Sequence, residues 1–159
     1  MSTIEVRFSP LTSHVRTARL VALSVARRAG MDEDQLDEVR LAVGETCSRA
    51  VGVHIARGTD EPVTMRMADD RAQFSIEVIN VGTLADDPTQ SMDLVEASNR
   101  ALAEGAPDGD AMPPGFGLAV VSGLVEDLFV TSDGGVTTVR MIWPLLPASI
   151  AEFVEPTAS

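Results

Sequence analysis

Val63-Thr-Met-Arg-Met-Ala-Asp-Asp-Arg-Ala-Gln-Phe-Ser-Ile-Glu-Val78 contains two short alternating segments separated by polar residues. Apolar side chains alternate with polar ones in residues 63–67 and again in 74–78. This two-residue period predicts two half-buried strands, with a turn at 68–71. Consecutive strands joined by a short turn form an antiparallel hairpin, so the centre of the chain predicts an antiparallel sheet.

The residues before this hairpin predict one further strand and two helices. Residues 3–8 alternate like a strand, and Pro10 then opens a helix that stops at Gly30. Asp32 caps a second helix that runs to about Ile55. Apolar residues recur along this second helix at helical spacing and predict its buried stripe: Leu36, Val39, Val43, Cys47, Ala50 and His54.

The C-terminal part predicts a short apolar helix over 118–125, followed by a second hairpin. Its strands are expected at 127–131 and 136–143, joined by Asp133-Gly-Gly135, and Pro144 ends the second strand. Helices grouped against strands that pair as hairpins define an α+β, two-layer α/β sandwich with a mainly antiparallel sheet and helices on one face. A dinucleotide-binding fold is excluded, because its strands alternate with helices.

Size and charge narrow the class of protein. The chain has 159 residues, 45% hydrophobic and 23% charged, which indicates one globular domain, expected over 1–144 with a C-terminal tail at 145–159. The net charge of −12 disfavours nucleic-acid binding. A single cysteine excludes a disulfide scaffold, and no apolar run is long enough to cross a membrane. We expect a soluble, cytoplasmic protein.

The segment 85–114 is unusually acidic. It contains seven acidic residues and one arginine, which is half of the net charge of the chain. A helix is expected over about 91–104. The composition of 105–114, rich in glycine, proline and aspartate, predicts a mobile loop.

Three places in the sequence carry residues that could take part in catalysis or ligand binding. On the second helix, Glu45 and Arg49 share a face; an i,i+4 salt bridge and a functional pair are both open readings. Asn80 and Gly82 end the central hairpin, as a plain turn or as a polar pocket floor. Gly115 and Gly117 precede a helix, where backbone amides can approach a phosphate. The spacing of the two histidines predicts no metal site.

Taken in order, these places resemble the RsbW/SpoIIAB-type anti-sigma factors, the serine-kinase branch of the GHKL ATPases. The resemblance covers about residues 3–143. It rests on four segments: Leu41-Ala-Val-Gly-Glu-Thr-Cys-Ser-Arg-Ala-Val51, Ile76-Glu-Val-Ile-Asn-Val-Gly82, Pro114-Gly-Phe-Gly-Leu-Ala-Val-Val-Ser-Gly-Leu-Val125 and Gly134-Gly-Val-Thr-Thr-Val-Arg140. It implies the Bergerat (GHKL ATPase) fold, with ATP or ADP as cofactor.

The resemblance implies a role for each candidate residue. Glu45 takes the place of the general base that acts on a partner serine. Arg49 stands where the family has a magnesium-binding asparagine, and a guanidinium cannot ligate a cation. Asn80 replaces the aspartate that meets the adenine amino group, and Gly82 is kept. The glycines at 115 and 117 face the phosphates, below a lid formed by the 105–114 loop.

These substitutions imply an anti-sigma factor with weakened or lost ATP binding and kinase activity. It would bind a sigma factor and be released by a STAS-domain anti-anti-sigma protein. The alternative is an active serine kinase whose Arg49 contacts phosphates; a third reading is an acidic α+β domain of another function. The resemblance also implies a homodimer. The first helix, with its four arginines, is either a docking patch or simply a solvated face.

Overall fold

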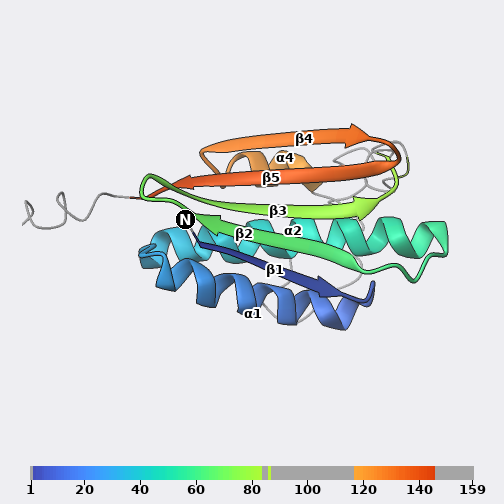
Figure 1. Cartoon of the computed structure of the whole chain (residues 1–159), viewed down its shortest axis with the longest axis horizontal. Coiled ribbons are helices and arrows are strands. Elements are labelled where there is room, and N and C mark those ends of the chain that lie inside the picture. Colours follow the sequence, from blue (N-terminus) through green and yellow to red (C-terminus); the bar gives the residue numbers. More distant parts are fainter. Residues whose placement is uncertain (1, 84–85, 87–116, 146–159) are drawn as a thin grey trace, which may run out of the picture.

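The computed structural model describes residues 2–83, 86 and 117–145. These residues form a five-stranded antiparallel sheet in the order β1-β2-β3-β5-β4. The helices lie behind the sheet, on one of its two faces (Figure 1). The strands are β1 (Ser2–Phe8), β2 (Val63–Asp69), β3 (Gln73–Val81), β4 (Asp127–Asp133) and β5 (Val136–Pro144). The predicted two-layer α+β sandwich with an antiparallel sheet is therefore confirmed.

Two long helices cover the inner face of the sheet. Helix α1 (Thr12–Arg28) begins two residues after Pro10, and α2 (Glu33–Arg57) begins after the predicted cap. The Asp32 side chain accepts a hydrogen bond from the backbone of Gln35, whose own side chain accepts from the Asp32 backbone. This capping box fixes the helix start. All residues of the predicted α2 stripe are buried.

The core is filled by apolar side chains from both layers. The inward residues of β2, β3 and β5 alternate as predicted, and Phe74 and Trp143 meet with ring centroids 6.3 Å apart. Each fully buried aromatic contributes a large apolar area to the core. The Trp143 indole N–H donates to the Leu124 carbonyl at 3.0 Å, which satisfies its single polar group.

The predicted limits of the first turn and of the apolar helix were wrong. The first turn spans residues 70–72, not 68–71, because β2 continues to Asp69. The Asp70 carboxylate closes this turn by accepting from the backbone N–H groups of Ala72 and Gln73. The apolar helix predicted over 118–125 is the shorter α4 (Gly117–Ser122). Its continuation is prevented at Gly123 and Leu124, whose amides bond to carbonyls three residues back.

The second hairpin has the expected turn chemistry, although β4 extends through Asp133. Its two linking residues, Gly134 and Gly135, both have positive φ, at 61° and 75°. Two left-handed residues in succession make the turn that matches the twist of the strands. Apart from Asp86, the acidic segment with its expected helix and loop lies outside the described residues, and so does the tail after Leu145.

Candidate functional site

Glu45 and Arg49 lie one turn apart in the middle of α2 and are both buried, at 5% and 4% exposure. Sequence reasoning placed Glu45 off the apolar stripe, which suggested exposure. Helix α2 is instead enclosed on several sides, since it packs against the sheet, α1 and α4. Two charged side chains are therefore removed from water, where each requires polar partners.

Arg49 reaches across the layer interface to the sheet. Its Nη1 donates a hydrogen bond to Asn80 Oδ1 at 3.0 Å, and Asn80 is 1% exposed. The Asn80 Nδ2 group donates to the Val81 carbonyl at 2.8 Å. Both polar ends of the Asn80 amide are thus engaged inside the protein. The structure joins two positions, 49 and 80, that the sequence presented as separate parts of a site.

Gly82 comes directly after the last residue of β3. Its backbone conformation favours glycine, with φ at +108°. A Cβ atom there would lie 2.8 Å from Val53 Cγ1, so α2 approaches the backbone too closely for any side chain. The Gly82 amide donates to the Gly135 carbonyl, and the buried Thr137 hydroxyl donates to the Gly82 carbonyl, each at 2.7 Å. Gly82 is therefore held between α2 and the second hairpin.

His54 is a site residue that sequence reasoning missed. It was placed on the buried stripe without a partner, and it is fully buried. The Val81 N–H donates to its Nε2 at 2.9 Å, and its Nδ1 lies 2.8 Å from the Glu61 carbonyl. These partners require a proton on Nδ1 and none on Nε2. A histidine on an apolar stripe was itself the signal, because a buried imidazole needs two hydrogen-bond partners.

Asp86 links Thr83, the residue after Gly82, to Arg57 on α2. Its Oδ2 accepts from the Thr83 backbone at 2.7 Å, from the Thr83 hydroxyl at 3.1 Å and from Arg57 Nη1 at 3.1 Å. The Thr83 backbone hydrogen bond is the main reason that the pKa of Asp86 is lowered; the hydroxyl and Arg57 act in the same direction. Sequence reasoning had counted this residue only as part of an acidic segment.

Of the two glycines expected to face phosphates, the structure describes one. Gly115 lies outside the described residues, whereas Gly117 is the first residue of α4. Helix α4 packs against α2, so Gly117 belongs to the same side of the sheet as Glu45 and Arg49. Within 2–83, 86 and 117–145, no group of three metal-ligating side chains could hold a metal ion.

The side chains at positions 49 and 80 do not fit magnesium and adenine in the way the resemblance implied. A guanidinium has no lone pair for a metal and repels it by charge. The Asn80 oxygen, which the resemblance assigned to the adenine amino group, already accepts from Arg49. An adenine amino group in the implied position would therefore compete with the Arg49 guanidinium for this buried oxygen.

The fold and the cluster together define a class. A five-stranded antiparallel sheet with α1 and α2 on one face, and polar side chains enclosed between α2 and β3, is the architecture of a GHKL-type ATPase domain. This chain belongs to the histidine kinase-like ATPase domain family, whose sequence model matches residues 8–143. The fold implied by the sequence resemblance is thereby confirmed.

Individual relatives agree with this family. The chain is 25% identical to the serine-protein kinase RsbW of Halalkalibacterium halodurans over 84% of its own length and 78% of that protein. It is 24% identical to RsbW of Bacillus subtilis, with 84% and 81% covered. A crystal structure of the RsbU and RsbW domains of Rv1364c from Mycobacterium tuberculosis superposes with a TM-score of 0.63 and 15% identity. That match covers 92% of this chain but only 34% of the other.

Among the helices within the described ranges, none combines the length and the hydropathy needed to cross a membrane.

Proposed function

We propose that this protein is an anti-sigma factor that works by partner exchange, with ATP binding and kinase activity weakened or lost. It binds a sigma factor and is counteracted by a STAS-domain anti-anti-sigma protein. The observation that carries the proposal is the buried hydrogen bond from Arg49 to Asn80. The similarity to RsbW proteins supports the kind of regulator, and the Arg49–Asn80 pair supports the loss of nucleotide chemistry.

Adenine bound at Asn80 would compete with Arg49 for the same buried oxygen. A hydrogen bond from a charged donor contributes about 1.5–3 kcal/mol when buried. Breaking it to admit adenine would weaken binding by about ten- to a hundredfold. Magnesium loses its side-chain ligand at position 49 and meets a positive charge there instead. Phosphoryl transfer depends on that metal for charge neutralisation, so turnover is expected to be weak or absent.

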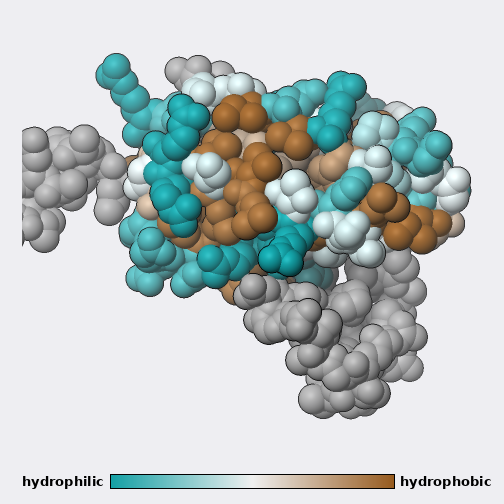
Figure 2. All heavy atoms as spheres, turned by 90° about the horizontal axis from the view of Figure 1, so that it is seen from below, coloured by the Kyte–Doolittle hydropathy of each residue, from teal (hydrophilic) through white to brown (hydrophobic). Residues whose placement is uncertain are grey.

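Helix α1 is the surface we assign to the protein partners. It contains four arginines and no acidic residue, in a chain of net charge −12. Arg16 and Arg27 are exposed on either side of Leu20, whose exposure reaches 60%. Figure 2 views the molecule from the side on which α1 lies in Figure 1 and shows a hydrophobic area bordered by hydrophilic surface. Arginine beside an exposed apolar side chain is typical of binding hot spots.

Isothermal titration calorimetry with ATP, with and without magnesium, tests the nucleotide part directly. The wild-type protein should show no binding in the micromolar range under either condition. The matched variant carries Arg49→Asn together with Asn80→Asp, which restores the residues that the resemblance implies. Magnesium-dependent binding gained by this variant supports the proposal, whereas tight magnesium-dependent binding by the wild type overturns it.

The partner part needs its own experiment. Purified sigma factors and STAS-domain proteins from the source organism are mixed with the chain and followed by analytical gel filtration, without nucleotide. We expect a complex with a sigma factor that a STAS-domain protein dissolves. Leu20→Ser and Arg16→Glu should weaken the complex, whereas Ile55→Ser, an equally exposed apolar position on α2, should not.

An active serine kinase is the second candidate, because the curated relatives are named serine-protein kinases and Glu45 is present on α2. In that case Glu45 accepts the proton of a serine hydroxyl on the partner. Glu45→Ala would abolish transfer of radiolabelled phosphate to a STAS-domain protein, with the fold checked by circular dichroism. An unchanged rate in Glu45→Ala would exclude Glu45 as the base.

A further inference from the structure

The face of the sheet opposite the helices carries a row of charged side chains across β1, β2, β3 and β5, which ends at Phe129 on β4. The register places Glu5 opposite Arg66, Arg66 opposite Glu77, Glu77 opposite Arg140, and Arg140 opposite Phe129. Directly opposed side chains on one face of a sheet lie about 5 Å apart and interact. In Figure 1 the strands lie in front of the helices, so this face of the sheet is turned away from α1, α2 and α4.

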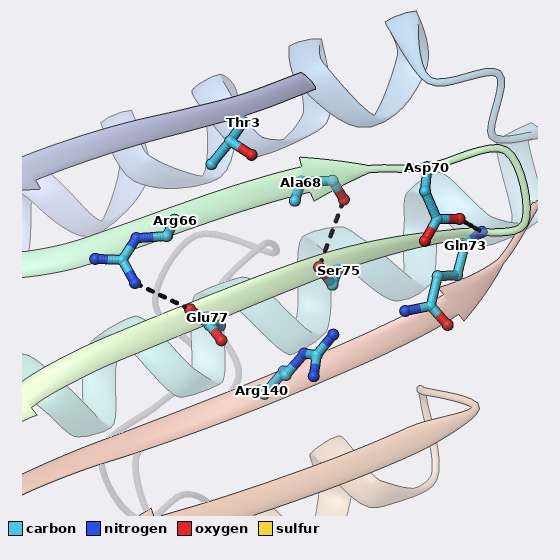
Figure 3. A pocket seen from close by; sticks show the side chains of 8 residues that line it. All are labelled: Thr3, Arg66, Ala68, Asp70, Gln73, Ser75, Glu77 and Arg140. Atoms are coloured by element: carbon cyan, nitrogen blue, oxygen red, sulfur yellow. Dashed lines mark hydrogen bonds and ion pairs between the residues drawn. The ribbon is translucent and has the colours of Figure 1, made fainter. Parts of the chain in front are cut away.

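The two arginines of this row differ in their ion pairs. Arg66 bonds to Glu5 at 3.1 and 3.2 Å and to Glu77 at 3.4 Å. The hydrogen bond to Arg66 is the main reason that the pKa of Glu5 is lowered. Within the described part of the chain, no carboxylate lies within ion-pair distance of Arg140. Figure 3 shows its guanidinium extending along the face toward Ser75, away from the Arg66–Glu77 pair.

Two shallow hollows flank Arg140. One, of about 230 Å³, is lined by the small residues Ala68 and Ser75, by Gln73, and by charged side chains of both signs, including the carboxylates of Asp70 and Glu77 (Figure 3). The other, of about 290 Å³, lies on the opposite side and is lined by Phe129 and two threonines. Both are smaller than the roughly 300–1,000 Å³ of pockets for small-molecule ligands. Their size fits single side chains of a protein partner better than a cofactor.

The second hollow has an apolar character that extends along β4 and β5. Phe129 is 49% exposed, and Val136 is 37% exposed. Aromatic residues and arginine are the types enriched at the centres of protein interfaces. An exposed phenylalanine directly opposite an arginine that forms no ion pair with the described carboxylates is therefore a surface suited to a partner that brings both an acid and an apolar group.

We propose that this outer sheet face is a second docking surface, which takes an extended segment of a partner protein. A carboxylate of that segment enters the hollow beside Ser75 and pairs with the guanidinium of Arg140, where the Gln73 amide can also donate. An apolar side chain two residues along the segment covers Phe129. Charge complementarity favours this occupant, because Arg140 is the cation of the row that makes no ion pair with a carboxylate of the described residues.

The spacing supports an extended occupant. Side chains two residues apart in an extended chain point the same way and lie about 6.8 Å apart. Arg140 and Phe129 are directly opposed on neighbouring strands, at about 5 Å. One residue of such a segment can therefore meet Arg140 while its neighbour two residues away lies on Phe129. This surface is on the opposite side of the sheet from Arg49 and Asn80, so it goes beyond the function proposed above.

Nuclear magnetic resonance titration with a defined peptide tests the proposal. The probe is acetyl-Thr-Leu-Thr-Asp-Thr-Val-Thr-amide, which places leucine, aspartate and valine on one face of an extended chain. Amide shifts are expected at outward residues of β3, β4 and β5. Replacing the aspartate of the peptide by asparagine, or Arg140 by Gln, should weaken binding about tenfold, because a charge-assisted hydrogen bond is lost.

Arg7→Gln is the matched protein control. Arg7 lies on β1, and its guanidinium is already paired with Glu5 at 3.1 Å. Binding to this variant should change by less than about twofold. Phe129→Ser should weaken binding independently of Arg140→Gln. Equal binding by wild type and Arg140→Gln overturns the proposal, and so do shifts confined to α1 or an absence of shifts at millimolar peptide.

Discussion

Arg49 on α2 and Asn80 on β3 are joined by a 3.0 Å hydrogen bond between two buried side chains. They are 31 residues apart in the sequence, and the bond connects the helical layer to the sheet. The Asn80 oxygen that would receive a ligand therefore has an internal partner. This pair is both a stabilising contact and the reason for expecting little nucleotide binding.

A double-mutant cycle measures this pair. Arg49→Met leaves the Asn80 oxygen buried without its donor, and Asn80→Leu removes the acceptor. The coupling free energy between the two substitutions is expected to be about 1.5–3 kcal/mol, as for a buried hydrogen bond with one charged partner. Urea unfolding of the four proteins provides the values. A coupling below about 0.5 kcal/mol would contradict the importance of the bond.

Gly82→Ala should destabilise the protein more than Gly30→Ala. Both glycines have positive φ, at +108° and +96°, so both substitutions strain the backbone. Only at Gly82 would the new Cβ also meet Val53 Cγ1 at 2.8 Å, whereas nothing lies within 4 Å at Gly30. The difference in the free energy of unfolding should be about 1–3 kcal/mol, the usual cost of overpacking. Equal losses would show that α2 yields without cost.

His54→Leu should cost about 1–3 kcal/mol, because it leaves the Val81 N–H without its acceptor. The exchange rate of the Val81 amide proton should rise in the variant, which a purely volumetric effect would not produce. His14→Leu is the control: its ring has a single longer contact of 3.3 Å, to the Ser9 carbonyl. That substitution should change stability by less than about 0.5 kcal/mol. An unchanged Val81 exchange rate would exclude the assigned role.

Cys47 should resist alkylation in the folded protein. Burial raises the pKa of its thiol from 9.0 to about 12. At pH 8 this shift alone lowers the thiolate fraction about a thousandfold, and the thiolate is the reactive form. Iodoacetamide labelling followed by mass spectrometry should therefore be negligible without urea and rise along the unfolding transition. Rapid labelling under native conditions would show that α2 opens locally.

The contact between Asp86 and Thr83 should weaken in acid. Because the pKa of Asp86 is lowered in the folded state, its contribution to stability is present above the unfolded pKa and is lost as pH falls through the folded value. The amide resonance of Thr83, which donates to Asp86, should shift in that range. In Asp86→Asn the Thr83 resonance should stay unchanged over the same pH range. A pH-independent Thr83 resonance in the wild type would contradict the assigned contact.

Much of the fold was predictable because its signals are local. The alternation in 63–67 and 74–78 follows from the two-residue period of a strand, and the core stripe of α2 follows from helical periodicity. The capping box at Asp32 and the paired glycines 134 and 135 are also short-range chemistry. The limit of α4 was not predictable, because the chain just after it is held by a long-range hydrogen bond from Trp143 to the Leu124 carbonyl. The first turn was misplaced although the Asp70 hydrogen bonds that close it are short-range.

For the candidate site too, some features follow from the sequence and others only from the tertiary structure. The sequence alone determined which residue types stand at positions 45, 49, 80, 82 and 117, and with them the family resemblance and the mismatch with magnesium. Only the tertiary structure decided that Arg49 donates to Asn80, that His54 holds the end of β3, and that Arg140 faces outward without a carboxylate partner among the described residues. The reason is physical: periodicity specifies which face of an element is buried, whereas the partner of a polar side chain depends on which distant elements pack beside it.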